Sequence, residues 1–422
     1  MNRLKNIFHQ IRNKIAFYPS LISFGGILLA SFMIYLEQLD ISGYLIEVAP
    51  GLVINNTETA RTLLSTLTGG LISLMVFSFS MVMILLNQAS SNFSPRVLPG
   101  IISDQRHQVV LGLYIATILY TIFILVSIEP IEKTYQTPGF SVLISIILTV
   151  ICLASFIYFI HHISQAIQVG TILTNIHKRT KSELAYLAES QKAMVLEFPT
   201  PEHWEAYTVN KYGYFYGVLK EDLLEVCKEH DTKIIVRLFK GQFILEDTVG
   251  ILSEKALSKQ GIDQVMATLL FSKEELVGEN YIYGFRQITE IGIKAMSPGI
   301  NDPGTALNTI DYLTSLFQSL IEKSEFEYLA DVEKTNWVQI KNAKFQEVLY
   351  NVMATYRLYC KHDSTVMRKL MQMLRTLTLH VIDSDQMDII KDEMEQLRLD
   401  AKSSIENKRD LHKIDSEFIS WS

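Results

Sequence analysis

Hydrophobic and polar residues are unevenly divided along this chain. Long apolar runs lie before residue 165, and most of the charged residues follow them. Four runs are long enough to cross a bilayer, because about 20 helical residues span roughly 30 Å of hydrocarbon. They are expected at about 17–36, 63–86, 109–128 and 140–160. The first is too long for the apolar part of a signal peptide, and four such runs rarely occur together in a soluble core. We therefore predict a four-helix transmembrane domain over residues 17–164.

Lysine and arginine residues in the short flanking segments predict the orientation of these spans. Most of them lie at the N-terminus, after the second span and after the fourth span: Arg3, Lys5, Arg12, Lys14, Arg96, Arg106, Lys178, Arg179 and Lys181. The other two connections carry only Arg61 and Lys133, beside several acidic residues. Both termini and the large C-terminal region are therefore expected on the cytoplasmic side.

Residues 1–16 form a separate amphipathic segment. Leu4, Phe8, Ile11 and Ile15 recur at three- and four-residue steps, and the basic residues lie off this stripe. The pattern predicts a helix in the headgroup plane of the bilayer. An ordinary flanking helix without lipid contact explains it equally well.

The second span carries polar residues on one face. Thr66, Ser73, Ser80 and Asn87 are spaced by seven, with Gly69, Val76 and Met83 between them. Seven-residue steps drift only about 20° around a helix, so these positions share one face. Such a face favours a partner other than lipid. One hypothesis is helix–helix packing through small residues, and the other is the lining of a water-filled path in an oligomer.

The polar segment from Asn87 to Gln108 is predicted to be a sharp cytoplasmic connection, because it contains Pro95 and Pro99. Arg96 lies beside the first proline. It is a candidate for holding an anion or contacting the cytoplasmic domain, although a plain connecting role suits a lone arginine better.

The C-terminal region is expected to be cytoplasmic and α+β. Residues 165–198 are predicted to continue the fourth span's helix as a rigid stalk, and residues 199–255 to form a small strand–helix–strand–strand subdomain. Residues 256–422 are predicted to be a helical subdomain, with segments at about 344–361, 363–382 and 384–407. The fold class is thus a mainly α integral membrane protein with a cytoplasmic α+β domain.

Composition excludes several classes of function. The net charge of −7 provides no basic field, so nucleic acid is not an expected partner. Cys152, Cys227 and Cys360 form no disulfide framework, and no nucleotide-binding, metalloprotease or hydrolase motif is present. His161 and His162 are neighbours on a helix and would point about 100° apart, which makes them poor joint metal ligands. We expect no cofactor, no metal and no enzyme activity.

Residues 297–306, "SPGINDPGTA", interrupt two apolar-periodic segments. Pro298 disfavours helical geometry at Ser297, and Gly299 permits a reversal of the chain. Asp302 or Asn301 can cap the next helix, which would begin at Pro303. One cap is sufficient, so the second polar residue is expected either to bond to a neighbouring element or subunit, or to contact a ligand.

The stretch "FRQITEIGIKAMSPGINDPGTALNTIDYL" (residues 285–313) resembles the signature of a bacterial family of predicted membrane proteins, domain of unknown function 2254. The stretch "ASSNFSPRVL" (89–98) is similar to a second conserved part of that family, and the four-span plan agrees along nearly the whole chain. One departure is that this chain has Glu275 and Asn280 where the family pattern has an arginine and an aspartate. The resemblance implies a bacterial inner-membrane location but supplies no reaction, substrate or cofactor.

Two functions are consistent with these features. The first is a homo-oligomeric channel or pore-like protein with a cytoplasmic domain that senses a small ligand or ion. The alternative is a membrane-anchored binding or scaffolding module without transport. A membrane enzyme that uses Asn301 and Asp302, with Glu290 or Asp311 nearby, is a lesser alternative.

Overall fold

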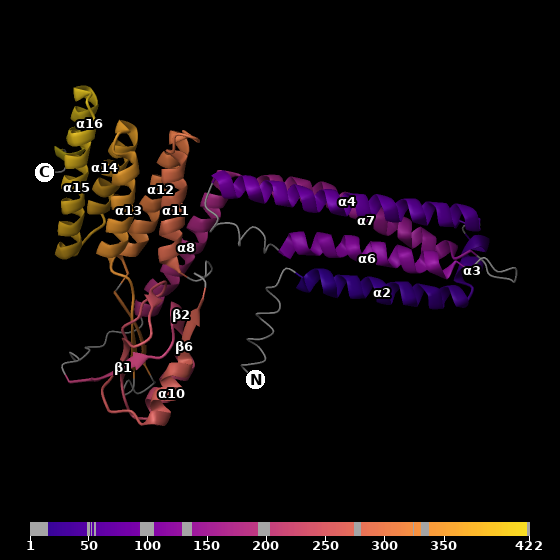
Figure 1. Ribbon diagram of the computed structural model, residues 1–422, viewed down its shortest axis with the longest axis horizontal. Coiled ribbons are helices and arrows are strands. Elements are labelled where there is room, and N and C mark those ends of the chain that lie inside the picture. The colour runs from indigo at the N-terminus through magenta and orange to yellow at the C-terminus, as the bar shows by residue number, and fades with distance from the viewer. Residues whose placement is uncertain are drawn as a thin grey trace. The chain divides into compact units, whose positions relative to one another are not determined.

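The computed structural model describes residues 16–48, 51, 53–54, 56–92, 105–128, 137–192, 203–273, 280–323, 325–330 and 337–419. The chain divides into two compact units at Gln168 and Val169. We call the first, with helices α2 to α7, the membrane unit, and the second, from α8 to the C-terminal helix, the C-terminal unit (Figure 1).

The membrane unit contains α2 (Phe17–Gln38), α3 (Ile41–Val48), α4 (Thr57–Asn92), α6 (Gln105–Ser127) and α7 (Gly139–Ala166). Four of these helices are long and apolar enough to cross a bilayer, which confirms the predicted spans. The short α3 was not predicted. The expectation of a loop from Asn87 is wrong for Asn87–Asn92, which are helical. Polar residues alone do not end a helix, and the breakers Pro95 and Pro99 come later.

Small residues allow α2 and α6 to approach closely. A Cβ atom on Gly26 would collide with the backbone of Ala116, and one on Gly112 would press against Ile22 and Pro19. Close backbone approach through small residues is a common way to pack helices in lipid, where apolar burial provides little driving force. Glu37, at the end of α2, joins this pair to α7. Its carboxylate accepts hydrogen bonds from Ser141 N (2.8 Å), Ser141 Oγ (2.7 Å) and Ser42 Oγ (2.6 Å).

The C-terminal unit begins with α8 (Val169–Lys192). The predicted continuous stalk is interrupted, because α7 ends at Ala166 and Gln168 lies outside both helices. Two sheets follow. The larger has the order β1 (Glu205–Val209), β5 (Thr248–Ser253), β3 (Ile234–Val236), β8 (Trp337–Lys341), β7 (Phe326–Ala330), and only β3 and β8 are parallel. The smaller has the order β4 (Phe243–Ile244), β2 (Gly213–Val218), β6 (Leu269–Ser272).

Helices α9 (Lys220–Glu229) and α10 (Lys259–Thr268) accompany these sheets. Phe215, Leu223, Ile251, Val265 and Val338 share their core. The expected division at residue 255 therefore differs from the structure. The α/β part extends to β6, and it also recruits β7 and β8 from a stretch for which no strand was predicted.

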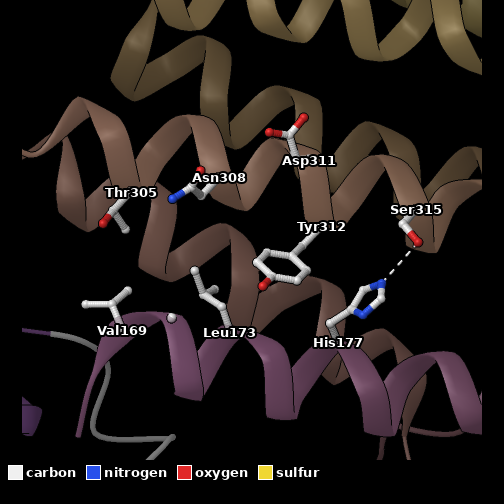
Figure 2. Close-up of a pocket in the computed structure, with 9 residues that line it drawn as sticks. Val169, Leu173, His177, Thr305, Asn308, Asp311, Tyr312 and Ser315 are labelled. Atoms are coloured by element: carbon white, nitrogen blue, oxygen red, sulfur yellow. Dashed lines mark hydrogen bonds between the residues drawn. The ribbon is translucent and has the colours of Figure 1, made fainter. Parts of the chain in front are cut away.

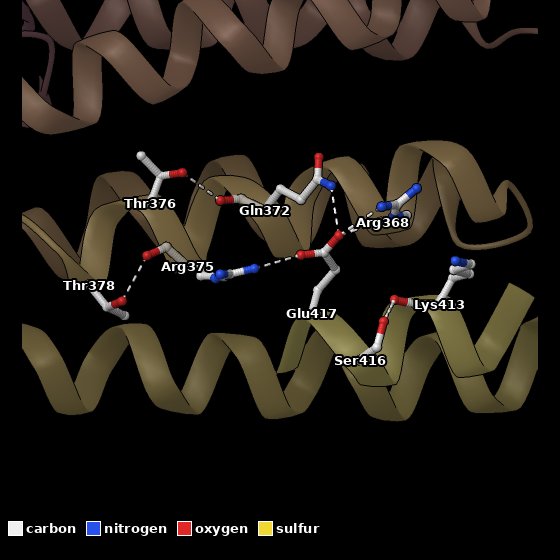
Figure 3. Close-up of polar contacts among 8 residues, drawn as sticks. All are labelled: Arg368, Gln372, Arg375, Thr376, Thr378, Lys413, Ser416 and Glu417. Atoms are coloured by element: carbon white, nitrogen blue, oxygen red, sulfur yellow. Dashed lines mark hydrogen bonds and ion pairs between the residues drawn. The ribbon is translucent and has the colours of Figure 1, made fainter. Parts of the chain in front are cut away.

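The remaining helices are α11 (Tyr281–Ala295), α12 (Pro303–Ile321), α13 (Phe345–Cys360), α14 (Ser364–Thr378), α15 (Ser384–Ser404) and α16 (Lys408–Ile419) (Figure 1). Helices α11 and α12 pack against α8; α13 and α14 pack against α11 and α12; and α15 and α16 lie farther from α8. The predicted apolar faces of α11 and α12 are buried, including Phe285 and Phe317, whose ring centroids are 4.7 Å apart. Figure 3 shows how Glu417 joins α16 to α14: its carboxylate accepts from Arg368 (2.9 Å), Gln372 (2.8 Å) and Arg375 (2.9 Å).

Candidate functional site

The "SPGINDP" motif forms the turn between α11 and α12. The carbonyl of Ser297 accepts from the backbone N–H groups of Ile300 and Asn301, and the N–H of Asp302 bonds to the carbonyl of Ala295 at 2.8 Å. Asp302 is the N-cap of α12, and Pro303 is its first residue, as the sequence predicts. The Asp302 carboxylate accepts from Thr305 N (3.1 Å) and Thr305 Oγ1 (2.6 Å). These bonds to Thr305 hold the pKa of Asp302 below its usual value.

Asn301 is the residue that reverses the chain. It has a φ of +48°, in the left-handed region, whereas Gly299 is not among the residues with positive φ. The expectation that Gly299 makes the reversal is therefore wrong. Asparagine tolerates this conformation better than most residues. Residues Pro298 to Gly304 are exposed. Asn301 thus has a conformational role in the turn that the sequence did not predict, and its side chain is exposed.

A cleft of about 490 Å³ lies between α8 and α12, starting one turn after the motif (Figure 2). From α8 it is lined by Val169, Gly170, Leu173 and His177, and from α12 by Thr305, Asn308, Asp311, Tyr312 and Ser315. Two hydrogen bonds cross between the helices: His177 Nε2 lies 3.0 Å from Ser315 Oγ, and Thr174 Oγ1 lies 2.9 Å from the Tyr312 hydroxyl. The cleft therefore has an apolar side on α8 and a hydroxyl- and amide-bearing side on α12.

The charge of the cleft is low. Burial, assisted by the nearby Lys181, lowers the pKa of His177, so this imidazole is neutral at neutral pH. The carboxylate of Asp311 is paired with Lys369 of α14 at 2.5 Å and points away from α8 in Figure 2. Among the described residues, those that line the cleft include no lysine or arginine. These groups suit a small uncharged molecule with hydrogen-bonding groups, and they do not suit an anion.

The polar stripe of α4 faces away from the rest of the membrane unit. Ala60, Leu64 and Leu71 are buried against α6 and α7. The stripe residues Thr66, Ser73, Ser80 and Asn87 are all exposed, together with Gly69, Val76 and Met83. The hydroxyls of Thr66 and Ser73 donate to the carbonyls of Thr62 and Gly69 on the same helix. The stripe therefore does not pack against the described helices of the membrane unit.

The adjacent histidines have different partners. His162 Nε2 lies 2.7 Å from Arg106 Nη1, and His161 Nε2 lies 3.1 Å from Gln165 Nε2. Over the described part of the chain, His, Cys, Asp and Glu residues form no group of three or more suited to a metal ion. The three cysteines are buried and form no disulfide with one another. Arg96 and residues 1–15 of the predicted interfacial helix (1–16) lie outside the described residues.

Comparison with known proteins places these features in a family. Residues 12–376 match the family described as "Predicted membrane protein (DUF2254)". The chain belongs to this family. Among curated proteins, DUF2254 relatives of this chain include the uncharacterized proteins Rv1290c of Mycobacterium tuberculosis and Mb1321c of Mycobacterium bovis. Each is 24% identical over 343 residues, which cover 77% of this chain and 64% of the relative. The chain thus spans less than two thirds of the length of these relatives. No solved structure matches this DUF2254 protein.

Sequence inspection missed the cleft. Its α12 residues Thr305, Asn308, Tyr312 and Ser315 recur at steps of three and four, which marks a polar face opposite the predicted apolar one. This polar periodicity is visible in the sequence, but a polar helix face usually contacts solvent and therefore does not predict a cleft. Only the packing of α8 beside it encloses a volume.

Proposed function

We propose that this DUF2254 protein is a homo-oligomeric, channel-like protein of the bacterial inner membrane, in which α4 lines a polar path. One observation carries the proposal: the polar stripe of α4 lies opposite the face that packs in the membrane unit. This position favours a partner outside the membrane unit over packing of the stripe within it. A second copy of the chain, or water, would then face the stripe.

The exposed faces of the other spans carry fewer hydroxyl and amide groups than that of α4, although α4 also exposes Ile72, Phe77, Phe79 and Ile84. In α2 they carry Leu21, Phe24, Leu28 and Phe32, and in α7 they carry Val150, Leu153 and Ile157. Large apolar side chains of this kind suit lipid. The exposed hydroxyls, glycine and amide of α4 do not gain from lipid contact, which supports an oligomer with α4 innermost.

The C-terminal unit would act as a cytoplasmic sensor. Its orientation rests on the basic residues of the short connections, and its first helix, α8, follows the last span after only two residues. The cleft beside α8 would then take a small uncharged ligand. Asn301 and Asp302 both serve the turn, which supports a non-enzymatic function.

Cysteine labelling in intact membranes tests the polar path. In a background without Cys152, Cys227 and Cys360, Ser73→Cys and Ser80→Cys should react with a small hydrophilic maleimide. Ile157→Cys, on the lipid-facing surface of α7, and Leu64→Cys, on the packed face of α4, are matched controls and should not react. Equal protection of all four positions, together with no ion flux in proteoliposomes, would overturn the proposal.

The cleft specifically favours a second candidate, a membrane-anchored binding module without transport. In that case, Ser73→Ala and Ser80→Ala should leave function unchanged, and only changes in the cleft should matter. Filling the cleft with Asn308→Trp would separate the two candidates, because a sensing channel should lose regulation of flux and retain the labelling of Ser73→Cys.

A further inference from the structure

A lysine is buried where the α/β part of the C-terminal unit meets its helices. Lys323 lies two residues after the end of α12 and is 8% exposed. Its Nζ lies 2.6 Å from the hydroxyl of Tyr281, the first residue of α11, and 3.8 Å from the centroid of that ring. Tyr281 is itself buried and bonds to the backbone of Ala343, next to β8. Buried lysines are rare, because removing an ammonium group from water is expensive unless it is well paired.

The neighbouring carboxylates already have lysine partners. Glu327 of β7 is 3% exposed and is paired with Lys220, the first residue of α9. Glu183 of α8 lies 3.7 Å from Lys240, which lies between β3 and β4. Among the described residues, the nearest charged groups of these elements are thus two carboxylates and three lysines. The exposed Glu347 of α13 acts on Tyr281 from farther away.

Lys323 is therefore the lysine of this group that belongs to neither of the two ion pairs, Lys220–Glu327 and Lys240–Glu183. Its closest polar contact is the neutral hydroxyl of Tyr281. We define Lys323, Tyr281, Glu183, Lys240, Glu327 and Lys220 as the joint cluster. It connects α8, α11 and α12 with β7, α9 and the β3–β4 connection, so its members come from both parts of the C-terminal unit.

We propose that the joint cluster is a pH-operated latch, which holds the α/β part against α8, α11 and α12 when Lys323 is neutral and loosens when Lys323 takes up a proton. The closed arrangement accommodates an uncharged amine, which can still donate a hydrogen bond to the hydroxyl oxygen of Tyr281. A charged Lys323 gains more from water than from this site. The proposal concerns the C-terminal unit alone and does not depend on transport.

The direction of the pH effect follows from proton linkage. The pKa of Lys323 is lowered to about 7, chiefly by burial, whereas the pKa of an exposed lysine is about 10.4. Between these values, opening of the latch takes up a proton. Opening should thus become up to about tenfold more favourable for each pH unit lost, and should level off below about pH 7, where both states are charged.

Hydrogen–deuterium exchange on the full-length protein in nanodiscs tests the latch. After correction for intrinsic exchange, peptides containing Tyr281, Lys323 and β7 should open more as the pH falls from 9 to 7. Peptides from α14 and α15 should not. In Lys323→Met the pH dependence of opening should vanish. The corrected exchange of these peptides should then remain, at every pH, at the level that the wild type shows at pH 9. Lys344→Met, at a half-exposed lysine paired with Glu325, is the matched control and should behave as wild type.

Tyr281→Phe provides a second test if Lys323→Met does not fold. Loss of the hydroxyl removes an acceptor of the ammonium group and should lower the pKa of Lys323 in the closed state further. Opening of the latch should therefore stop depending on pH only at a lower pH than in the wild type. Pulsed detection of the Lys323 ¹⁵Nζ signal should show the same shift. Three results would overturn the proposal. The pH dependence of hydrogen exchange could persist in Lys323→Met, it could spread evenly over the C-terminal unit, or it could be absent from the wild type.

Discussion

Polar side chains are satisfied differently in the two units. In the membrane unit, many serine and threonine hydroxyls bond to a carbonyl four residues earlier on their own helix, as Ser73 and Thr121 do. In the C-terminal unit, hydroxyls such as that of Thr289 make the same bond, but polar groups also link separate elements, as in the contacts of Thr309 with Tyr356 and of Glu417 with three side chains of α14. A hydroxyl on a span therefore needs no tertiary partner, so its position alone says little about packing. Buried polar contacts of the C-terminal unit instead specify which elements meet.

The largest expected effect tests the tight packing of the C-terminal unit. A side chain at Gly292 of α11 would collide with the hydroxyls of Tyr356 and Thr309, which lie 2.7 Å apart. Gly292→Val should destabilise the protein by about 3 kcal/mol, because the buried Tyr356 cannot move aside. Thermal unfolding of the detergent-solubilised protein measures this. Gly170→Ala, where a Cβ atom meets nothing within 4 Å, is the control and should be neutral or slightly stabilising.

Glu37 tests the same comparison within the membrane unit, because its carboxylate links separate helices there instead of bonding to its own helix. Glu37→Ala leaves the first N–H groups of α7 and the Ser42 hydroxyl without their acceptor, and should destabilise the unit by about 2 kcal/mol. Glu37→Gln retains one acceptor oxygen and should have about half this effect. If Glu37→Ala behaves like Ser73→Ala, whose hydroxyl bonds only to its own helix, the contrast between the two kinds of contact is wrong.

Asn301 tests whether the turn depends on backbone conformation alone. Asn301→Val should destabilise the C-terminal unit by about 1–2 kcal/mol, because a β-branched residue is strained at positive φ. Asn301→Gly should remain within a few tenths of a kcal/mol of wild type. The unfolding midpoints of the two variants measure this. Equal losses in both would mean that the asparagine amide makes a required contact.

The smallest effect is expected at Glu417, on the solvent side of the C-terminal unit. Its contacts, first with Gln372 and then with Arg368 and Arg375, lower its pKa. The stabilisation is therefore present above the unfolded-state pKa of about 4.3 and is lost as the pH falls through the lower folded-state pKa. Glu417→Gln should be less stable than wild type by less than about 1 kcal/mol at pH 7 and equal to it near pH 3. A constant difference across this pH range would contradict an ionic contribution.

The sequence by itself determined the features that depend on neighbouring residues. The four spans follow from the length of apolar runs, and the α11–α12 turn from Pro298, Asp302 and Pro303. The faces of α11 and α12 follow from their periodicity. In each case the free energy is decided within a few turns of one helix, so the pattern is visible without knowledge of the fold.

Tertiary structure alone decided the rest. The pairing of β8 with β3 joins residues about a hundred positions apart in the chain, and no local pattern marks Trp337–Lys341 as a partner of Ile234–Val236. The same is true of the packed face of α4, of the cleft between α8 and α12, and of the burial of Lys323. Each of these features depends on which surfaces of the chain contact one another. Such long-range contacts are decided by the burial and hydrogen bonding of the whole folded chain, not by the residues next to one another in the sequence.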